Sequence, residues 1–275
     1  LADASQRVAG PRPVAGPRHR AALVKPTAWQ ERVLRGFDRA AERYDRLTRL
    51  QRSVAWRLAQ LCRREELSDG LWVDLGSGTG HLAKALEELH PGRSVLRVDG
   101  SRAMLRGHPD HAEVLRWDLA AGLPVWSEAP TLLASSFCLH WLPNPQRVLQ
   151  QWARRLSPAG LLAVALPVDG CFPQWQESAR RCGVRCTALP FPSSDDLLKT
   201  IPAQQLRMTR RVSYTVTSPS LPLLLKPIRR IGAGTSPQAP LALRDWRRLQ
   251  TNWSDRRNDG QLRLTWVIQL LLIRG

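Results

Sequence analysis

The sequence predicts an α/β fold built on a largely parallel β-sheet. A short apolar strand over 71–75 runs into a glycine-rich turn, Gly76-Ser77-Gly78-Thr79-Gly80, and a helix begins at about His81. Nineteen residues beyond Gly80, Asp99 closes a second apolar strand. After these, strand-like and helical segments alternate, as βαβ units require. The order of strand, glycine turn, helix, strand and acid is that of a Rossmann-like domain.

The glycine turn has the chemistry of a nucleotide-binding loop. Glycine carries no Cβ, so the backbone can approach a ligand closely, and the free N–H groups at the start of the following helix favour a negative group. Asp99 is placed to accept hydrogen bonds from ribose hydroxyls. The spacing is G-x-G-x-G after Asp74, whereas nicotinamide-binding proteins have G-x-G-x-x-G. The whole set resembles the S-adenosylmethionine (SAM) site of class I methyltransferases; the alternative is a structural turn in another doubly wound protein.

A helical region precedes the first strand. Apolar residues recur every three or four positions over 27–62, which fits one kinked helix or two. We expect this N-terminal helical cap, residues 27–66, to close over the cofactor. Its segment 37–45 is polar enough to line the mouth of a pocket, where Tyr44 either faces a ligand or simply packs.

The remaining chain completes a sheet of seven strands whose last strand is antiparallel. The expected strands are 71–75, 94–98, 113–115, 131–135, 160–166, 206–216 and 262–272. Between the last two, residues 217–261 are too many for a hairpin loop and contain helical pieces at 221–231 and 244–253, so we expect a helical lid. The predicted division is a disordered basic tail (1–26), the cap (27–66), a SAM-binding Rossmann-like core (67–216), the lid (217–261) and a final core strand (262–275).

The composition bounds the partners and the compartment. A net charge of +18 attracts nucleic acid, an anionic membrane or an acidic protein, but the same arginine excess over only four lysines fits the bias of a GC-rich genome. The five cysteines show no metal-like spacing, so we expect reduced thiols in a cytoplasmic protein and no metal site. No apolar run approaches the roughly 20 residues that span a bilayer, and there is no secretory signal.

Four stretches carry a more specific pattern. FDRAAERYDRLTRLQ at 37–51 has the form F-x-R-A-A-x-x-Y-(D/E), and SSFCLHWL at 135–142 follows the fourth strand. LKPIRRIGA at 225–233 has the form L-K-x-x-G-A with extra residues, and LQTNW at 249–253 is followed by LTW at 264–266. In these stretches the chain resembles the malonyl-[acyl-carrier protein] O-methyltransferase family of biotin biosynthesis.

The resemblance covers about residues 35–275 and implies a set of cofactor contacts. Asp118, after the third strand, would accept a hydrogen bond from the adenine amino group. Ser136 and His140 stand where the family has Asn and Gln. Trp141 would pack beside the methionine part of SAM, although plain core packing is the alternative. The expected SAM-binding residues are Asp74, Gly76, Gly78, Gly80, Asp99, Gly100, Met104, Asp118, Ser136 and Trp141.

The resemblance also implies a reaction. SAM would methylate the free carboxylate of malonyl-[acyl-carrier protein], or of malonyl-CoA, and so prime pimelate synthesis for biotin, with an acidic carrier protein as partner. A carboxylate is already ionised at neutral pH, so no general base is needed. Carboxylate specificity calls for a cation, most naturally arginine; Arg43, Arg229 and Arg230 are candidates, although each also fits an ordinary surface arginine. The candidate catalytic residues are Tyr44, His140 and Arg229, and His140 could instead be a packed or capping histidine.

Three other functions compete with this hypothesis. The charge favours an RNA methyltransferase, but residues 135–138 lack the (N/D)-P-P-(Y/F) motif usual for base-amine methylation, and no RNA-binding module is apparent. Methylation of another small carboxylate is a second alternative. A non-catalytic SAM-fold binding protein is a third, against which the intact Asp74, Gly76, Gly78 and Asp99 argue.

Overall fold

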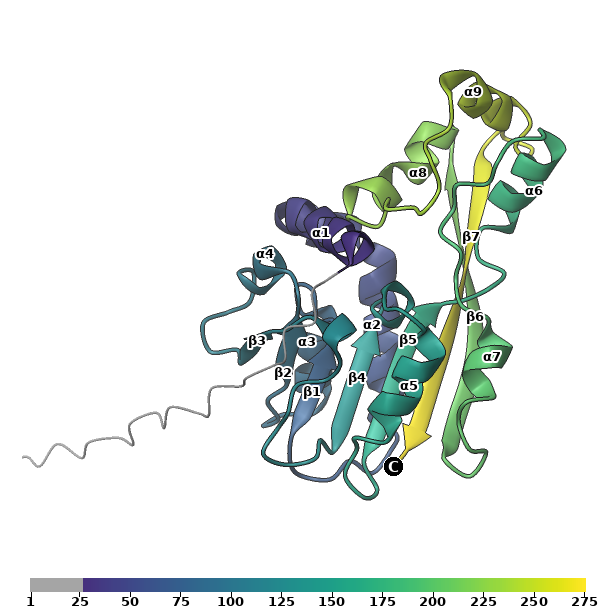
Figure 1. Cartoon of the computed structure of the whole chain (residues 1–275). Helices are drawn as coiled ribbons and strands as arrows, with labels where there is room; N and C mark the ends of the chain where they lie inside the picture. Colours follow the sequence, from purple (N-terminus) through teal and green to yellow (C-terminus); the bar gives the residue numbers. More distant parts are fainter. Residues whose placement is uncertain (1–26) are drawn as a thin grey trace, which may run out of the picture.

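The computed structural model describes residues 27–275, so the predicted tail, 1–26, lies outside the described residues (Figure 1). One sheet has the strand order β3, β2, β1, β4, β5, β7, β6. The strand bounds are β1 (Trp72–Leu75), β2 (Leu96–Asp99), β3 (Val114–Arg116), β4 (Leu132–Ser136), β5 (Leu161–Pro167), β6 (Leu206–Ser218) and β7 (Leu262–Arg274). The strands β1 to β5 pair in parallel, and β7 runs antiparallel to both β5 and β6. The predicted seven-stranded α/β sheet with an antiparallel last strand is confirmed.

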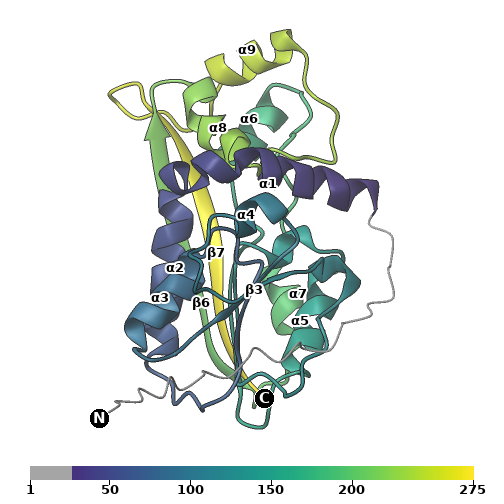
Figure 2. The same cartoon turned by 90° about the vertical axis from the view of Figure 1, so that its left-hand side faces the viewer.

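Helices cover both faces of the parallel strands. On one face lie α2 (Arg49–Cys62) and α3 (His81–Leu89), and on the other α5 (Pro145–Ala153) and α7 (Ser194–Leu198), as Figure 2 shows. Leu58 of α2 belongs to the core on the first side, whereas Trp152 of α5 belongs to the core on the second side. Every residue of β1 and β5 is therefore buried. Burial on both faces explains why these strands are nearly continuous apolar runs in the sequence.

The N-terminal region forms two helices rather than one kinked helix. The first, α1 (Ala28–Leu47), begins with a capping box in which Thr27 and Gln30 satisfy each other's backbone N–H groups, an arrangement that stabilises a helix start. The chain then turns at Thr48 into α2. Helix α1 crosses the molecule above the parallel strands (Figure 2).

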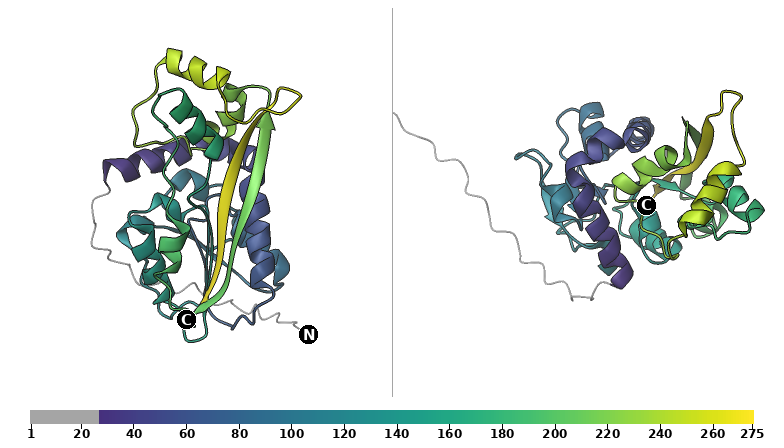
Figure 3. Two further views of the ribbon diagram at one scale, coloured as in Figure 1. Left: turned by 90° about the vertical axis from the view of Figure 1, so that its right-hand side faces the viewer. Right: turned by 90° about the horizontal axis from the view of Figure 1, so that it is seen from above.

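Three further helices lie above α1, beside the ends of β6 and β7 that extend past the parallel strands (Figures 1 and 3). They are α6 (Pro173–Arg181), α8 (Leu221–Arg230) and α9 (Leu243–Thr251). The backbones of α1 and of the segment after α8 touch, since a Cβ on Gly36 would lie 2.9 Å from the carbonyl oxygen of Gly232. Arg43 Nε also donates to the carbonyl oxygen of Arg230, at 3.1 Å.

Short helical turns complete the loops beyond the strands: α4 (Arg102–Leu105), η1 (Leu119–Ala121) and η2 (Leu139–Trp141). Within residues 27–275, no helix is both long and apolar enough to cross a membrane.

Candidate active site

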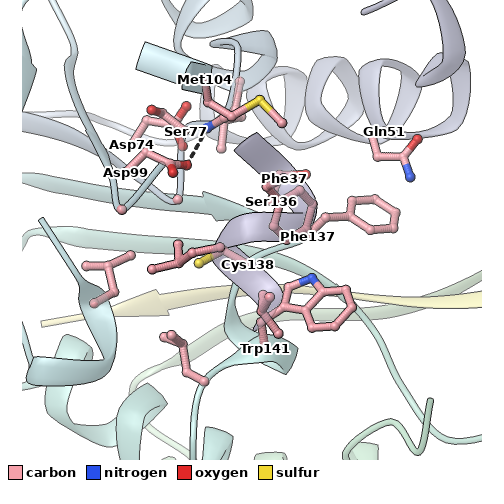
Figure 4. Close-up of a pocket in the computed structure, with 18 of the residues that line it drawn as sticks. Phe37, Gln51, Asp74, Ser77, Asp99, Met104, Ser136, Phe137, Cys138 and Trp141 are labelled. Atoms are coloured by element: carbon pink, nitrogen blue, oxygen red, sulfur yellow. Dashed lines mark hydrogen bonds between the residues drawn. The ribbon is translucent and has the colours of Figure 1, made fainter. Parts of the chain in front are cut away.

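The first of two adjoining cavities lies at the carboxyl ends of β1, β2 and β4. The sheet order reverses between β1 and β4, and ligands of open α/β sheets bind at such a switch point. Figure 4 shows the side chains that surround the cavity. Its walls contain nine of the ten predicted SAM-binding residues: Asp74, Gly76, Gly78, Asp99, Gly100, Met104, Asp118, Ser136 and Trp141. The tenth, Gly80, does not line it.

The three glycines of the turn have different tasks. All have positive φ: 74° at Gly76, 54° at Gly78 and 87° at Gly80, a conformation that side chains disfavour. A Cβ on Gly76 would overlap the side chain of Cys138, whereas a Cβ on Gly78 would meet nothing within 4 Å. Gly76 is thus fixed by packing, Gly78 borders open space in the cavity, and Gly80 is the N-terminal cap residue of α3.

Asp99 is tied to the glycine turn. Its Oδ2 accepts from the Gly78 N–H at 2.8 Å, and its Oδ1 accepts from the Ser101 N–H at 2.7 Å. Burial raises the pKa of this carboxyl, while the two backbone hydrogen bonds oppose the rise. A carboxylate oxygen can accept more than one hydrogen bond, so both oxygens keep capacity for the hydroxyls of a ligand.

Asp74 holds the turn together from below. It is 1% exposed, and its Oδ2 accepts from the Ala83 N–H at the start of α3, at 3.1 Å. Burial raises the pKa of its carboxyl to about 7. Its hydrogen bond therefore joins β1 to α3 and fixes the path of the glycines between them.

The cavity also has polar groups whose hydrogen bonds a ligand would complete. The Ser136 hydroxyl is buried and has no partner in the part of the chain that the structure describes. Asp118 Oδ1 accepts from the Ala120 N–H at 3.0 Å, which leaves Oδ2 for a donor such as an exocyclic amine. Together with the open space beside Gly78, these groups fit an adenosine-bearing cofactor.

Polar residues of α1, within the segment 37–45 that was expected at the mouth of the pocket, and of the turn after it hold this helix to the loops around the first cavity. The Thr79 hydroxyl donates to Asp45 at 2.5 Å, and His81 Nε2 lies 2.9 Å from the hydroxyl of Thr48. In the middle of α1, Asp38 accepts from the Ser101 hydroxyl at 2.6 Å. The aspartates at 38 and 45 were visible in the sequence, but nothing there indicated which loop they would meet.

A second cavity of about 450 Å³ adjoins the first. The two share a wall composed of Phe37, Tyr44, Gln51, Phe137 and Trp141. Beyond this wall the second cavity is bordered by the loop that follows β5, by α8 and α9, and by the segment 231–241. The two cavities therefore approach each other most closely at these five side chains.

All three predicted catalytic candidates line the second cavity, and Tyr44 lines both. Burial, followed by the charges of Asp99 and Asp45, raises the pKa of the Tyr44 phenol, so the hydroxyl stays a hydrogen-bond donor. Burial lowers the pKa of His140 to about 3, so its ring is neutral at physiological pH.

The arginine candidates separate in the structure. Arg229 is exposed and lines the second cavity, whereas Arg43 and Arg230 line neither cavity. Arg32, which sequence reasoning missed, is the other cation in the lining; it stacks over Trp29 at 5.5 Å. Gln51, also missed, places a neutral amide in the shared wall.

No cluster of three or more His, Cys, Asp or Glu side chains is arranged to hold a metal ion within residues 27–275. Each of the five cysteines is a free thiol.

Comparison with known proteins identifies the class. Residues 73–164 match the methyltransferase domain family. A putative methyltransferase from Bacillus halodurans has the same fold, with a TM-score of 0.55 at 15% identity over 79% of this chain and 97% of that one. The fold, the cavity at the switch point and this domain match define a class I SAM-dependent methyltransferase.

Over most of its length the chain is similar to proteins named malonyl-[acyl-carrier protein] O-methyltransferase. The one from Geobacter sulfurreducens is 28% identical over 75% of this chain and 82% of its own length. The one from Alcanivorax borkumensis is 29% identical over 87% of this chain and 84% of its own length. A trans-aconitate 2-methyltransferase from Paracidovorax citrulli is 35% identical, but over only 34% of this chain and 38% of its own length.

Proposed function

We propose that the protein methylates the free carboxylate of a malonyl group carried as a thioester on an acidic acyl-carrier protein, which primes pimelate synthesis for biotin in the cytoplasm. The similarity to named malonyl-carrier methyltransferases over most of the chain supports this substrate. The observation that carries the proposal is the pair of cavities that meet at one wall. One cavity would hold the methyl donor and the other the acyl acceptor.

On the donor side, the proposed roles follow from the contacts. Asp99 would bind the ribose, Asp118 the adenine amino group and Ser136 a polar group of the methionine part. Met104, 1% exposed, would pack beside the purine. When bound, SAM supplies an electrophilic methyl group, which an ionised carboxylate accepts without losing a proton.

On the acceptor side, the residues would orient the carboxylate and exclude water. Tyr44 and Gln51 place a phenolic hydroxyl and an amide in the shared wall, where both can donate to a carboxylate. Their neighbours Phe37 and Trp141 keep the wall apolar, and holding two reactants in line in a dry site can supply a large part of the rate in such a transfer. His140 would orient the acceptor rather than act as a base.

We propose that the cap (27–66) and the lid (217–261) close over both cavities around the contact between Gly36 and Gly232.

The small number of cations in the second cavity argues against a free polycarboxylate as the acceptor. Within residues 27–275 the second cavity is lined by only two arginines, Arg32 and Arg229, and both are exposed. A tricarboxylate would need more charge within the cavity than this lining provides.

Transfer of label from methyl-labelled SAM tests the substrate directly. The acceptors are malonyl-carrier protein, acetyl-carrier protein, free malonate, trans-aconitate and bulk tRNA. We expect alkali-labile label on malonyl-carrier protein, much less on free malonate and none on acetyl-carrier protein, which has no free carboxylate. Label on tRNA, or equal rates with malonate and malonyl-carrier protein, would contradict the proposal.

The donor site has its own test. We expect Asp99→Ala to lose measurable SAM binding by calorimetry while the protein stays folded by circular dichroism. Asp99→Asn keeps an acceptor oxygen for one backbone N–H and should retain weak binding. Unchanged affinity in Asp99→Ala would refute the assignment of Asp99 to the ribose.

A further inference from the structure

The second cavity is larger than a malonyl group requires. Its volume of about 450 Å³ lies in the range of roughly 300–1,000 Å³ found for pockets that enclose drug-sized ligands. A malonyl group has a single methylene between its two carbonyl carbons. The space beyond the shared wall must therefore serve another part of the acceptor.

An unbroken row of rings forms one side of this space. His140 lies 5.7 Å from Phe191, Phe191 lies 5.6 Å from Phe172, Phe172 lies 6.2 Å from Trp175, and Trp175 lies 5.9 Å from Trp246, measured between ring centroids. The row leads from η2, beside the shared wall, to α9. Such a wall suits an extended, largely uncharged chain that lies along the rings.

Two polar atoms in this row lack partners. Trp175 Nε1 and His140 Nδ1 are both buried and without a hydrogen bond in the part of the chain that the structure describes. Trp175 is only 8% exposed. Buried groups of this kind are rare in folded proteins, and each calls for an explanation such as a ligand.

The chemistry of these atoms defines what they can bind. An indole N–H only donates, and a neutral imidazole donates through one nitrogen and accepts through the other. Because burial keeps the His140 ring neutral, neither residue supplies a charge. The pair therefore matches the carbonyl oxygens and N–H groups of uncharged amides and thioesters. The two arginines of the lining, Arg32 and Arg229, belong instead to exposed helix positions.

We propose that the second cavity binds an amide-bearing thioester arm, with Trp175 and His140 hydrogen-bonded to its amide and thioester groups. The inference rests on the proposed function, because the arm is what joins a malonyl group to its carrier. On this proposal, the enzyme recognises the arm itself as well as the surface of the carrier protein. Trp175 and His140 are then specificity-determining residues.

A pair of small acceptors isolates the contribution of the arm. Malonyl-pantetheine presents the malonyl thioester with two amides, whereas the methyl thioester of malonate presents the same reacting group with none. We expect the wild-type protein to favour malonyl-pantetheine in kcat/KM by at least roughly tenfold, the effect of one or two neutral hydrogen bonds and the contacts along the rings.

Variants assign the effect to the two side chains. Trp175→Phe removes the indole N–H and keeps a ring, and Trp246→Phe is the matched control, because Trp246 lies in the same row but its nitrogen is not a buried, unpartnered atom. Trp175→Phe should lower kcat/KM for malonyl-pantetheine by roughly 2- to 10-fold and leave the methyl thioester unchanged. Trp246→Phe should leave the ratio of the two acceptors unchanged. His140→Phe should also lower kcat/KM for malonyl-pantetheine and, because the His140 ring lies 5.0 Å from that of Trp141 in the shared wall, it should lower kcat/KM for the methyl thioester by a smaller factor.

Direct binding separates this inference from the proposed function. Calorimetry with acetyl-pantetheine, which has no carboxylate to methylate, should show binding to the wild-type protein that Trp175→Phe and His140→Phe weaken. Binding of acetyl-pantetheine without methylation of any malonyl thioester would overturn the proposed function and retain the inference. Equal kcat/KM of the wild-type protein for the two malonyl thioesters would overturn the inference alone. So would a loss in kcat/KM that is equal on the two acceptors in Trp175→Phe and is matched by Trp246→Phe.

Discussion

Three glycine-to-alanine substitutions separate the structural and ligand-binding tasks of the glycine turn. Gly76 and Gly78 both have positive φ, as does Gly92, which lies in the turn after α3 outside both cavities. Alanine at any of them meets the cost of a left-handed conformation, about 1–2 kcal/mol. Only at Gly76 would the new methyl group also overlap a neighbour, the side chain of Cys138. At Gly78 and Gly92 nothing lies within 4 Å of the added carbon.

The magnitudes follow from these differences. Overpacking against Cys138 adds about 1–3 kcal/mol, so Gly76→Ala should lose about 2–5 kcal/mol of unfolding free energy, which corresponds to a fall in Tm of roughly 5–15 °C for a chain of this size. Gly78→Ala and Gly92→Ala should each lower Tm by only about 2–6 °C. The methyl group of Gly78→Ala occupies space proposed for SAM, so its SAM affinity should fall at least about tenfold, or about 1.4 kcal/mol.

Thermal unfolding with and without SAM, together with calorimetry, measures both effects. Gly92→Ala is the control for backbone strain and should bind SAM like the wild type. Wild-type affinity in Gly78→Ala would refute the placement of the cofactor over the turn. A Tm for Gly76→Ala as high as that for Gly92→Ala would refute the packing argument at Cys138.

The remaining predictions concern the acceptor side. When the pH is lowered from 7 to 5, the unfolding free energy of His140→Phe should rise by about 2 kcal/mol relative to that of the wild type, measured by denaturant unfolding. In the wild type, the unfolded histidine takes up a proton below about pH 6.5, whereas the buried ring, with a pKa of about 3, stays neutral. A constant difference between pH 7 and pH 5 would contradict the burial of a neutral ring. The raised pKa of Asp74, about 7, acts in the opposite sense, since stability from this group falls as the pH rises from about 4 to 7, and it cancels in the comparison. Gly36→Ala should separate α1 from α8, because its Cβ would lie 2.9 Å from the Gly232 carbonyl oxygen, and limited proteolysis should then cut the segment 232–241 faster; an unchanged cleavage rate would show that this contact does not hold the two together. Raising the salt from about 50 to 500 mM should increase KM for malonyl-carrier protein several-fold with little change in kcat, because the Debye length falls from about 14 to about 4 Å and the exposed arginines are screened; an equal rise for malonyl-pantetheine would exclude carrier docking as the cause.

The sheet could be predicted closely because each strand carried a local signal. The segments 71–75 and 160–166 are apolar runs bounded by turn residues, and the structure buries both. The alternation in 206–216 and 262–272 predicted two strands, and they pair over nearly their full length. The number of N-terminal helices stayed open because the apolar period is continuous through the turn at Thr48.

The two cavities differ in how far the sequence revealed them. The first depends on a contiguous motif and on acids that follow strands, so nine of its predicted residues line it. The second is assembled from α1, the loop after β5 and the region of α8 and α9, and α1 precedes the other two by more than a hundred residues. Its aromatic residues have the spacing of ordinary core residues, and only their unpartnered nitrogens, which the sequence does not reveal, distinguish a binding wall from a packed one.

The location of the positive charge bears on whether the net charge of +18 is functional. The shared wall consists of neutral side chains, and the two arginines of the second cavity are exposed. A charge in the interior would be costly without a partner, and the transfer to an ionised carboxylate needs no proton from the protein. On the proposed function, we therefore expect Arg32 and Arg229 to act on the approach of the acceptor more than on the chemical step at the shared wall. If the charge has a role, it lies at the exposed surface, where an acidic carrier protein would be steered toward the mouth of the cavity. Once the carrier protein has docked, the aromatic row would select the amide-bearing arm.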